Sequence, residues 1–259
     1  MNEYRKKVKK DKIKLVIIQL SLLLTLVFGW EILVRLEILN EFLVSKPSSI
    51  MKLFVTYWNE GNLLSHIKIS VYETLLGLFI GTSLGIVIAI GLWWNKFIAK
   101  VLDPFLVVLN ALPKTALAPI LIIWVGLGIK GIVVVAISLS LVVTIMSALN
   151  YFQSVDEEKV KMLKTFGANK FQILTKLILP ANLPNLINIL KINIGMSWVG
   201  VIVGEFLVSR EGIGYLVVYG GQVFRLDLVM MGVIVLAIIA LLMYLCVSLL
   251  EKYFIRRIR

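Results

Sequence analysis

Four ionisable residues lie within long apolar segments of the chain or at their ends, namely Glu73, Lys114, Lys191 and Glu205. A charged side chain at membrane depth costs roughly 3 kcal/mol, so these residues are candidates for binding an ion or a polar solute. Lys114 directly follows Pro113, and a cation beside backbone groups that a proline leaves free can receive an anion. The alternative to anion binding is that Lys114 packs against protein or contacts lipid.

Position favours a structural role for two of these four residues. Lys191 lies about two turns into its apolar segment, within reach of the membrane interface for a long side chain. Glu205 precedes a glycine-rich stretch whose backbone it can bind.

Neutral polar residues can line a cavity together with these groups. The path predicted through such a cavity comprises Asn110, Lys114, Ser138, Trp198 and Glu205, and packing would also explain each of them.

The residue types that enzymes need do not converge in this sequence. His66 is the sole histidine and Cys246 the sole cysteine, so one chain can build neither a histidine-rich metal site nor a disulfide. The apolar segments hold no Ser/His constellation and no pair of carboxylates at similar depth. The phosphate-binding loop GxxxxGK[ST] is also missing. We therefore predict no catalytic residue, no metal site and no cofactor bound by this chain.

Long apolar segments carry all of these candidates. The chain is 59% hydrophobic and 16% charged, with a mean hydropathy of +0.95, which excludes a water-soluble fold. Its net charge of +12 favours a membrane over a nucleic acid as the partner of the chain, because the cationic residues cluster between apolar runs.

A helix of about 20 apolar residues is long enough to cross a bilayer. Six segments qualify, which predicts an all-α membrane protein with six transmembrane helices: Ile13–Leu36, Ile67–Trp94, Val101–Val125, Gly131–Leu149, Leu183–Leu207 and Leu228–Leu250.

The distribution of Lys and Arg predicts how these helices are oriented. Eighteen of the 27 lie on the side of the N-terminus, seven on the other side, and two within spans. Cationic residues accumulate on the cytoplasmic side, so both termini are expected to be cytoplasmic. We expect a basic cytoplasmic segment at residues 1–14 and a single transmembrane domain at residues 15–259.

The third span is predicted to be broken. Pro104, Pro113 and Pro119 interrupt it, and each proline removes a backbone donor. Irregular backbone survives at membrane depth only when protein or a wet cavity surrounds it, so we expect this region to face the bundle interior. A re-entrant pair of helices is the alternative.

The cytoplasmic loop between the fourth and fifth spans, about residues 151–182, is too well patterned for a passive connection. Ser154 and Glu157 have the spacing of a capping box, and Val160, Leu163 and Phe166 recur at helical spacing. Acidic residues would begin this helix, lysines would occupy its later turns, and a glycine that can adopt the left-handed conformation would end it. The residues predicted to contact a soluble partner are Asp156, Glu157, Glu158, Lys161, Lys164, Thr165, Phe166, Gly167 and Ala168.

A second amphipathic stretch, Phe171–Leu179, follows this helix, and Pro180 and Pro184 are expected to turn the chain into the fifth span. An interfacial helix that only covers the base of the bundle is the alternative to a docking element. On the second span, Gly77, Gly81 and Gly85 form a stripe of small residues that permits close helix packing, within one chain or between two.

Gly167 followed after nine residues by Leu177-Ile178-Leu179-Pro180 resembles the cytoplasmic EAA loop of bacterial ABC importer permeases. The likeness extends from about residue 64 to the end and is closest to the nitrate, sulfonate and taurine branch. It includes the motifs Asp103-Pro104 and Gly212-Ile213-Gly214. The sequence departs from the family at residues 161–163, which are Lys-Met-Leu where the family has Glu-Ala-Ala, and at Glu73, where the branch usually carries a basic residue.

The resemblance implies a type I importer permease in a bacterial cell membrane that forms the pathway for a small solute. Its expected partners are two ATP-binding subunits that carry ATP and Mg, an extracytoplasmic substrate-binding protein, a second copy of the chain and membrane lipid, with no nucleic acid. The solute would be of the nitrate, sulfonate or taurine type, or a vitamin precursor such as a thiamine pyrimidine or riboflavin. A glutamate at position 157 or 158 would replace the motif glutamate.

Two other functions are alternatives to an importer permease. A membrane-embedded enzyme would need the catalytic constellations that the sequence lacks. An ion channel or an ATP-independent carrier of this kind would be expected to show internal repeats, and the two halves of the chain are not visibly similar.

Overall fold

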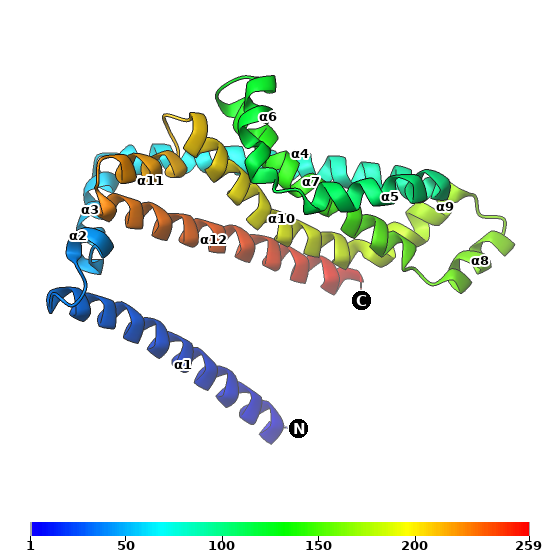
Figure 1. The fold of residues 1–259 in the computed structure, drawn as a ribbon. Coiled ribbons are helices and arrows are strands. Elements are labelled where there is room, and N and C mark those ends of the chain that lie inside the picture. Colours follow the sequence, from blue (N-terminus) through cyan, green and yellow to red (C-terminus); the bar gives the residue numbers. More distant parts are fainter. Residues whose placement is uncertain (1, 259) are drawn as a thin grey trace. The chain divides into compact units, whose positions relative to one another are not determined.

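The computed structural model describes the backbone of residues 2–258 and the side chains of residues 10, 11 and 13–252. Within this part of the chain all regular structure is helical (Figure 1). The helices are α1 Asn2–Arg35, α2 Glu41–Val44, α3 Pro47–Asn59, α4 Asn62–Trp94, α5 Lys96–Ala111, the 3₁₀ helix η1 Lys114–Leu117, α6 Ala118–Val125, α7 Ile129–Gln153, α8 Glu157–Thr165, α9 Lys170–Ile173, the π-helix η2 Leu174–Ile178, α10 Leu179–Val208, α11 Ile213–Gln222 and α12 Leu226–Ile258.

The chain divides into two compact units, and the single transmembrane domain expected over residues 15–259 stays a prediction. The first unit comprises Met1–Leu63 and Val217–Val233, and the second comprises Leu64–Leu216 and Ile234–Arg259. In the first unit, Glu31 on α1 accepts hydrogen bonds from the backbone nitrogen of Ser48 at 3.0 Å and from its hydroxyl at 2.9 Å. These bonds connect α1 to the start of α3. The second unit carries most of the buried residues and all of the candidate sites.

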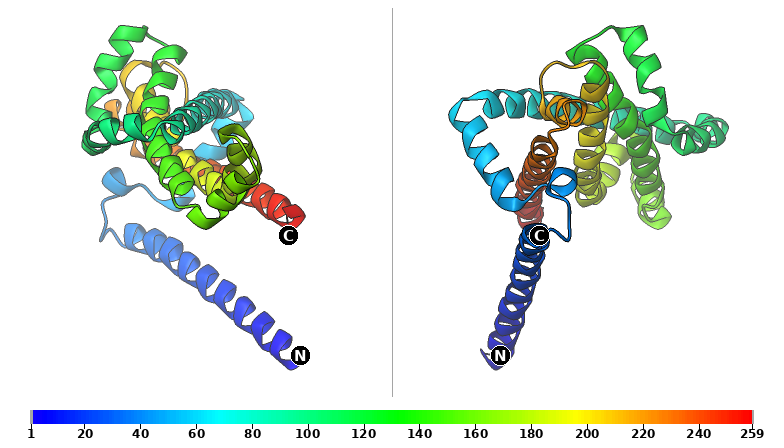
Figure 2. Two further views of the ribbon diagram at one scale, coloured as in Figure 1. Left: turned by 90° about the vertical axis from the view of Figure 1, so that its right-hand side faces the viewer. Right: turned by 60° about the vertical axis from the view of Figure 1, so that its left-hand side comes forward.

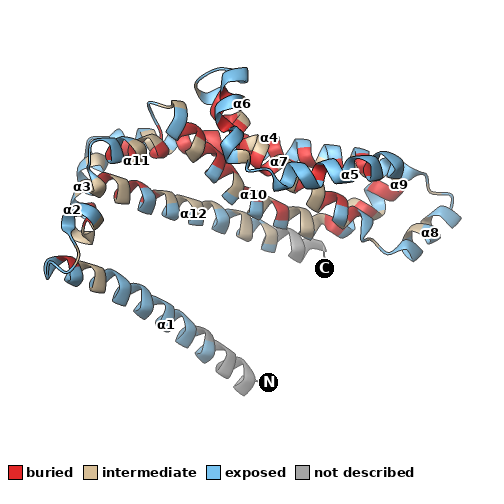
Figure 3. Ribbon diagram, in the orientation of Figure 1, coloured by how far each residue is buried: buried red, intermediate tan, exposed pale blue. Residues whose placement is uncertain are grey.

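Close packing of α4, α7 and α10 forms the centre of the second unit (Figures 2 and 3). Gly77, Gly81 and Gly85 of α4 lie against Ala136, Ser140 and Thr144 of α7, and a β-carbon on Gly77 would come within 2.6 Å of the β-carbon of Ala136. The stripe of small residues therefore mediates packing within one chain, which decides between the two possibilities that the sequence left open.

Five of the six predicted membrane spans are confirmed as single helices. Among the residues that the structure describes, five helices have the length and apolarity to cross a bilayer: Ile13–Arg35, Asn62–Trp94, Ile129–Gln153, Lys170–Val208 and Leu226–Lys252. The segment predicted as the third span is a pair of helices, Lys96–Ala111 and Lys114–Val125, bent by 83° at the break. Counting this pair as one broken span gives the six that the sequence predicts.

Only one of the three prolines coincides with the break. Pro113 lies in the bend, whereas Pro104 lies inside α5 and Pro119 occupies the first turn of α6, where a missing donor costs nothing. The expectation that this region faces the bundle interior holds for part of it, because Leu106 of α5 belongs to the buried core of the second unit. Ala118 and Ile122 of α6 are buried in the unit, while Trp124 is 77% exposed.

The loop after α7 begins differently from the prediction. Asp156 caps α8 through its carboxylate, which accepts a hydrogen bond from the backbone nitrogen of Glu158 at 2.8 Å. Ser154 instead ends α7 and donates its hydroxyl hydrogen to the carbonyl of Tyr151. The predicted capping box at Ser154 is therefore wrong, because an aspartate two residues later competes successfully for the cap position.

A capping box does occur at the next helix, where the sequence reading missed it. The side chain of Asn169 accepts from the backbone of Gln172, whose side chain accepts in turn from the backbone of Asn169. From there α9, the π-turn η2 and α10 run as one apolar segment, Lys170–Val208. The expected turn at Pro180 and Pro184 is wrong, since Pro180 lies in the first turn of α10 and the helix continues through Pro184.

Candidate functional site

The short helix α8 presents opposite faces to the bundle and to solvent. Val160 and Leu163 pack onto the buried cluster of the second unit. Met162 and Phe166, which lie about 40° apart when successive residues are separated by about 100°, are 54% and 80% exposed. The prediction that Phe166 belongs to the packed edge is wrong, because it lies roughly 120° from Val160 around the helix. Two exposed apolar side chains on a short helix outside the spans are typical of a docking surface.

Gly167 ends α8 in the left-handed conformation that the sequence predicts. Its φ angle is 78°, and the backbone nitrogens of Gly167 and Ala168 donate to the carbonyls of Lys164 and Leu163. No atom lies within 4 Å of the position that a β-carbon on Gly167 would occupy. The glycine is therefore required by its backbone conformation and not by crowding.

The charged residues of α8 are mostly solvated. Glu157 and Lys161 form an ion pair at 4.0 Å with side chains 80% and 75% exposed, so this pair contributes little to stability. Asp156 acts as the helix cap, and Glu158 supplies the backbone donor to it. Thr165 donates its hydroxyl hydrogen to the carbonyl of Lys161. The predicted contact residues thus divide into those that shape the helix and those free to meet a partner.

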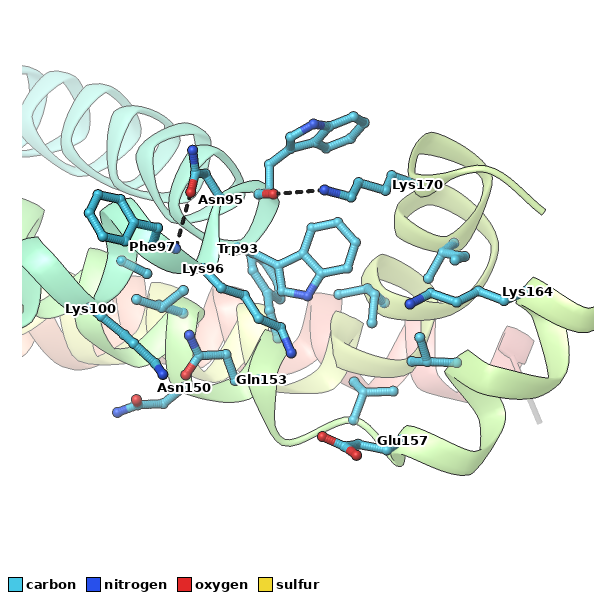
Figure 4. A pocket seen from close by; sticks show the side chains of 18 of the residues that line it. Trp93, Asn95, Lys96, Phe97, Lys100, Asn150, Gln153, Glu157, Lys164 and Lys170 are labelled. Carbon is cyan, nitrogen blue, oxygen red and sulfur yellow. Dashed lines mark hydrogen bonds between the residues drawn. The ribbon is translucent and has the colours of Figure 1, made fainter. Parts of the chain in front are cut away.

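A pocket of about 1160 Å³ separates α8 from the body of the second unit (Figure 4). The end of α4, the start of α5, the end of α7 and the α8–α9 segment all contribute to its walls. Lys96 and Lys100 reach into the pocket from α5, and Lys164 points toward it from α8. The Lys170 ammonium donates to the carbonyl of Trp94 at 3.3 Å across one end.

Three of the five residues predicted to line a translocation path lie on α5, η1 and α7. Lys114 donates to the backbone carbonyl and the side-chain oxygen of Asn110, at 3.1 and 3.4 Å, beside the break that follows α5. Ser138 donates to the carbonyl of Val135 within α7. Asn110 is exposed and Lys114 and Ser138 are partly buried. Among the five predicted residues, the described hydrogen bonds join only Asn110 and Lys114.

Trp198 and Glu205 lie in the packed interior of the chain. They are 6% and 1% exposed. Glu205 accepts hydrogen bonds at 2.5 Å from the hydroxyl of Ser70 and from the backbone nitrogen of Gly214. This contact with the glycine-rich loop is the structural role that the sequence offered as the alternative. The place of both residues on a translocation path stays a prediction.

Glu73 of α4 is buried as deeply as Glu205. It is 1% exposed, and its Oε2 atom has no hydrogen-bond partner among the described residues. The glutamate that stands where the branch usually has a basic residue therefore lies in the packed interior of the chain.

We expect Glu205→Ala to lower the melting temperature of the purified chain. The change leaves the backbone nitrogen of Gly214 and the hydroxyl of Ser70 without their buried acceptor, at about 1–3 kcal/mol for each such group. The exposed Glu211→Ala is the matched control and is expected to change the melting temperature little. Equal melting temperatures for the two variants would contradict the structural role of Glu205.

Lys191 forms an ion pair instead of extending alone to the interface. Its ammonium binds the carboxylate of Glu251 on α12, and it lies 5.7 Å from the centre of the Tyr244 ring. The side chains of Lys191 and Glu251 are 14% and 21% exposed. Glu251 directly follows the predicted sixth span, so the Lys191 side chain reaches toward the end of that span, and the pair connects α10 to α12.

A buried polar network that the sequence reading did not identify lies between α4, α7 and α10. The side-chain amide of Asn193 donates to the hydroxyl oxygens of Thr82 and Thr144 at 2.8 and 2.7 Å. Thr144 donates in turn to the carbonyl of Ser140. All three of the linked side chains are at most 4% exposed. The network fixes the register of the three central helices.

Comparison with known proteins identifies the family. The model of the binding-protein-dependent transport system inner membrane component matches residues 81–259. A Bacillus subtilis permease named for aliphatic sulfonate transport, SsuC, is 29% identical over 224 residues, which cover 86% of this chain and 81% of that protein. The taurine transport system permease TauC of Escherichia coli is 26% identical over 238 residues, covering 90% and 86%. The formylaminopyrimidine transport permease ThiX of Halalkalibacterium halodurans is 29% identical over 192 residues, covering 74% and 76%.

The fold agrees with this assignment. A crystal structure of a bacterial ABC transporter involved in alginate import superimposes with a TM-score of 0.67 at 15% sequence identity, covering 96% of this chain and 98% of that chain. This likeness shows the fold, and the family match over most of the chain shows the membership. The chain therefore belongs to the family of binding-protein-dependent transport system inner membrane components, and it is a permease subunit of an ABC importer and not an enzyme.

Proposed function

We propose that the outer face of α8, formed by Met162 and Phe166, is the surface that receives the ATP-binding subunit. Importer permeases of this fold work with ATPase subunits and a substrate-binding protein. The single observation that supports the proposal is the exposure of these two apolar side chains, 54% and 80%, on a helix whose other apolar residues pack inward. A soluble subunit that covers them removes apolar surface from water.

Lys161, Met162 and Leu163 stand where the family has Glu-Ala-Ala, and their placement in the structure suits this docking mode. Leu163 packs onto the core of the second unit and Met162 is exposed to solvent. One residue of the motif segment therefore holds α8 against the unit, and another is available to the ATP-binding subunit. Glu158 is exposed in the first turn and is available to a basic partner surface. We assign the coupling role to this helix and to its terminal Gly167.

The proposed assembly contains two copies of the chain, two ATP-binding subunits that hold ATP and Mg, and one extracytoplasmic binding protein. In this assembly both termini and α8 are cytoplasmic, in agreement with the excess of Lys and Arg on that side. Closure of the ATPase subunits moves α8, and the packed helices α4, α7 and α10 transmit that movement to the pathway. The candidates for residues that line it are Asn110, Lys114, Ser138, Trp198 and Glu205.

Co-purification tests this assembly. A tagged chain isolated from membranes in which it is expressed with the ATP-binding subunit encoded beside it is expected to retain that subunit. The complex in liposomes is expected to hydrolyse ATP faster when the loaded binding protein is added. Solute transport by the chain alone, without any ATP-binding subunit, would contradict the proposal.

For the solute we propose a small sulfonate, the class named for two of the relatives. A vitamin precursor is the second candidate, because the formylaminopyrimidine permease is as similar, at 29% identity. Binding of aliphatic sulfonates, taurine and formylaminopyrimidine to the partner binding protein separates the two candidates. Tight binding of the pyrimidine with no binding of sulfonates would overturn the first.

A further inference from the structure

The pocket between α8 and the body of the second unit is strongly basic. Five lysines line it: Lys96, Lys100, Lys161, Lys164 and Lys170. Only two acidic residues, Asp103 and Glu157, line the same pocket. Its volume of about 1160 Å³ is slightly above the usual range of small-ligand sites, so an anionic group and its ordered water fit inside.

Most of this positive charge is not neutralised within the chain. Lys161 has one distant ion pair with Glu157, and Lys170 binds a backbone carbonyl. In the described part of the chain Lys96, Lys100 and Lys164 make no hydrogen bond or ion pair. Three unpaired ammonium groups converging on one cavity are a site for an anion with several oxygens, because lysine binds phosphate as a point charge.

The surroundings of the pocket indicate that this anion belongs to a lipid. Trp93 and Trp94 line the pocket at the end of the membrane-spanning helix α4, and amphipathic indole rings favour this depth. On α5, Phe97 and Val101 are 75% and 48% exposed, while Lys96 and Lys100 lie next to them in sequence and reach into the pocket. Acyl chains lying along Phe97 and Val101 would place a head group at the lysines.

The proposed ATPase-docking surface leaves this pocket open. Glu157, Lys161 and Lys164 of α8 line the pocket, and they lie close together around the helix at about 100° per residue. Met162 and Phe166 point to roughly the opposite side of the same helix. One helix thus carries a basic face toward the pocket and an apolar face away from it.

We propose that this pocket binds the phosphate head group of an anionic phospholipid from the leaflet on the α8 side of the membrane. Basic pockets between the ends of transmembrane helices bind such head groups. The bound lipid would bridge α5 and α8, which are otherwise separated by the pocket, and would therefore stabilise the position of α8. This inference is independent of the docking proposal, because it can be tested on the isolated chain.

Native mass spectrometry of the detergent-purified full chain, titrated with phosphatidylglycerol or phosphatidylcholine, tests the proposal. We expect phosphatidylglycerol to bind at least tenfold more tightly than phosphatidylcholine. We expect Lys96→Gln/Lys100→Gln to weaken phosphatidylglycerol binding about thirtyfold, because each lysine near an anionic head group contributes about a factor of five. Phosphatidylcholine binding is expected to stay the same.

Two control variants make the result specific. Lys159→Gln/Lys176→Gln removes two exposed lysines of the same loop that do not line the pocket, and is expected to change phosphatidylglycerol affinity less than twofold. Lys96→Arg/Lys100→Arg keeps both charges and is expected to retain binding, which also covers the case in which the glutamine variant does not fold. Equal loss in the Lys159/Lys176 variant would overturn the proposal.

Competition with inorganic phosphate distinguishes a site for a lipid head group from a site for a free anion. We expect millimolar phosphate to displace phosphatidylglycerol only weakly, because the acyl chains contribute apolar contacts that the free anion lacks. If phosphate displaced phosphatidylglycerol at a concentration equal to that of the lipid, the site would be one for free phosphate and the lipid assignment would be overturned. Equal affinity for phosphatidylcholine would overturn it as well.

Discussion

Gly200→Leu is expected to prevent most of the protein from folding. A β-carbon on Gly200 of α10 would lie 2.9 Å from the backbone nitrogen of Ala136 on α7 and closer still to its α-carbon. Backbone atoms at the centre of a packed helix pair cannot move aside as a flexible side chain can, so we expect a cost at the upper end of that for overpacked cores, about 3 kcal/mol or more. Fluorescence-detected size exclusion of membrane extracts measures the loss of the monodisperse peak.

Gly195→Leu is the matched control on the same helix. No atom lies within 4 Å of the position that a β-carbon on Gly195 would occupy, and the residue is exposed in the single chain. We expect this variant to give a monodisperse peak close to that of the unaltered protein. If the two leucine variants behaved alike, the close contact of α7 and α10 at Ala136 would not be what holds the unit together.

Gly167→Val is expected to abolish ATP-driven transport while the protein still folds and inserts. A φ angle of 78° costs roughly 1–2 kcal/mol for a residue with a β-carbon and more for a branched one, so the end of α8 would rearrange. The helices of the core do not depend on this turn, since no atom crowds the glycine. Uptake of labelled solute and ATP hydrolysis stimulated by the binding protein, both in liposomes, measure the loss.

Gly167→Asn separates backbone conformation from other effects of substitution. Asparagine tolerates the left-handed region far better than valine does. We therefore expect this variant to keep a substantial part of the stimulated ATP hydrolysis. Full activity of the valine variant would show that the turn after α8 has no part in coupling.

The sequence predicted the spans well because apolar length is a property of contiguous residues. Five helices and one broken pair lie where hydropathy indicated them, and the stop at Gly167 follows from a residue that ends helices by its own conformation. The cap of α8 was misplaced by two residues, since Ser154 and Asp156 both satisfy the local pattern and only the end of α7 decides between them.

The candidate site was less predictable because it depends on contacts between distant segments. The partner of Lys191 is Glu251, 60 residues away, and the acceptor role of Glu205 involves Ser70, 135 residues away. The outward direction of Phe166 depends on which side of α8 the bundle occupies. The pocket is assembled from two stretches far apart in sequence, residues 93–103 and 149–178, so the proximity of its lysines could not be recognised from spacing.

Site-specific photo-crosslinking on α8 tests the central claim most directly. A photoreactive residue replaces, one at a time, Met162 or Phe166 on the exposed face and Val160 or Leu163 on the packed face, in the complete transporter in membranes. We predict crosslinks to the ATP-binding subunit from positions 162 and 166, with crosslinks from positions 160 and 163 confined to the chain itself. Absence of crosslinks to that subunit from 162 and 166 in the active, assembled transporter would contradict the assignment of α8 as the coupling element.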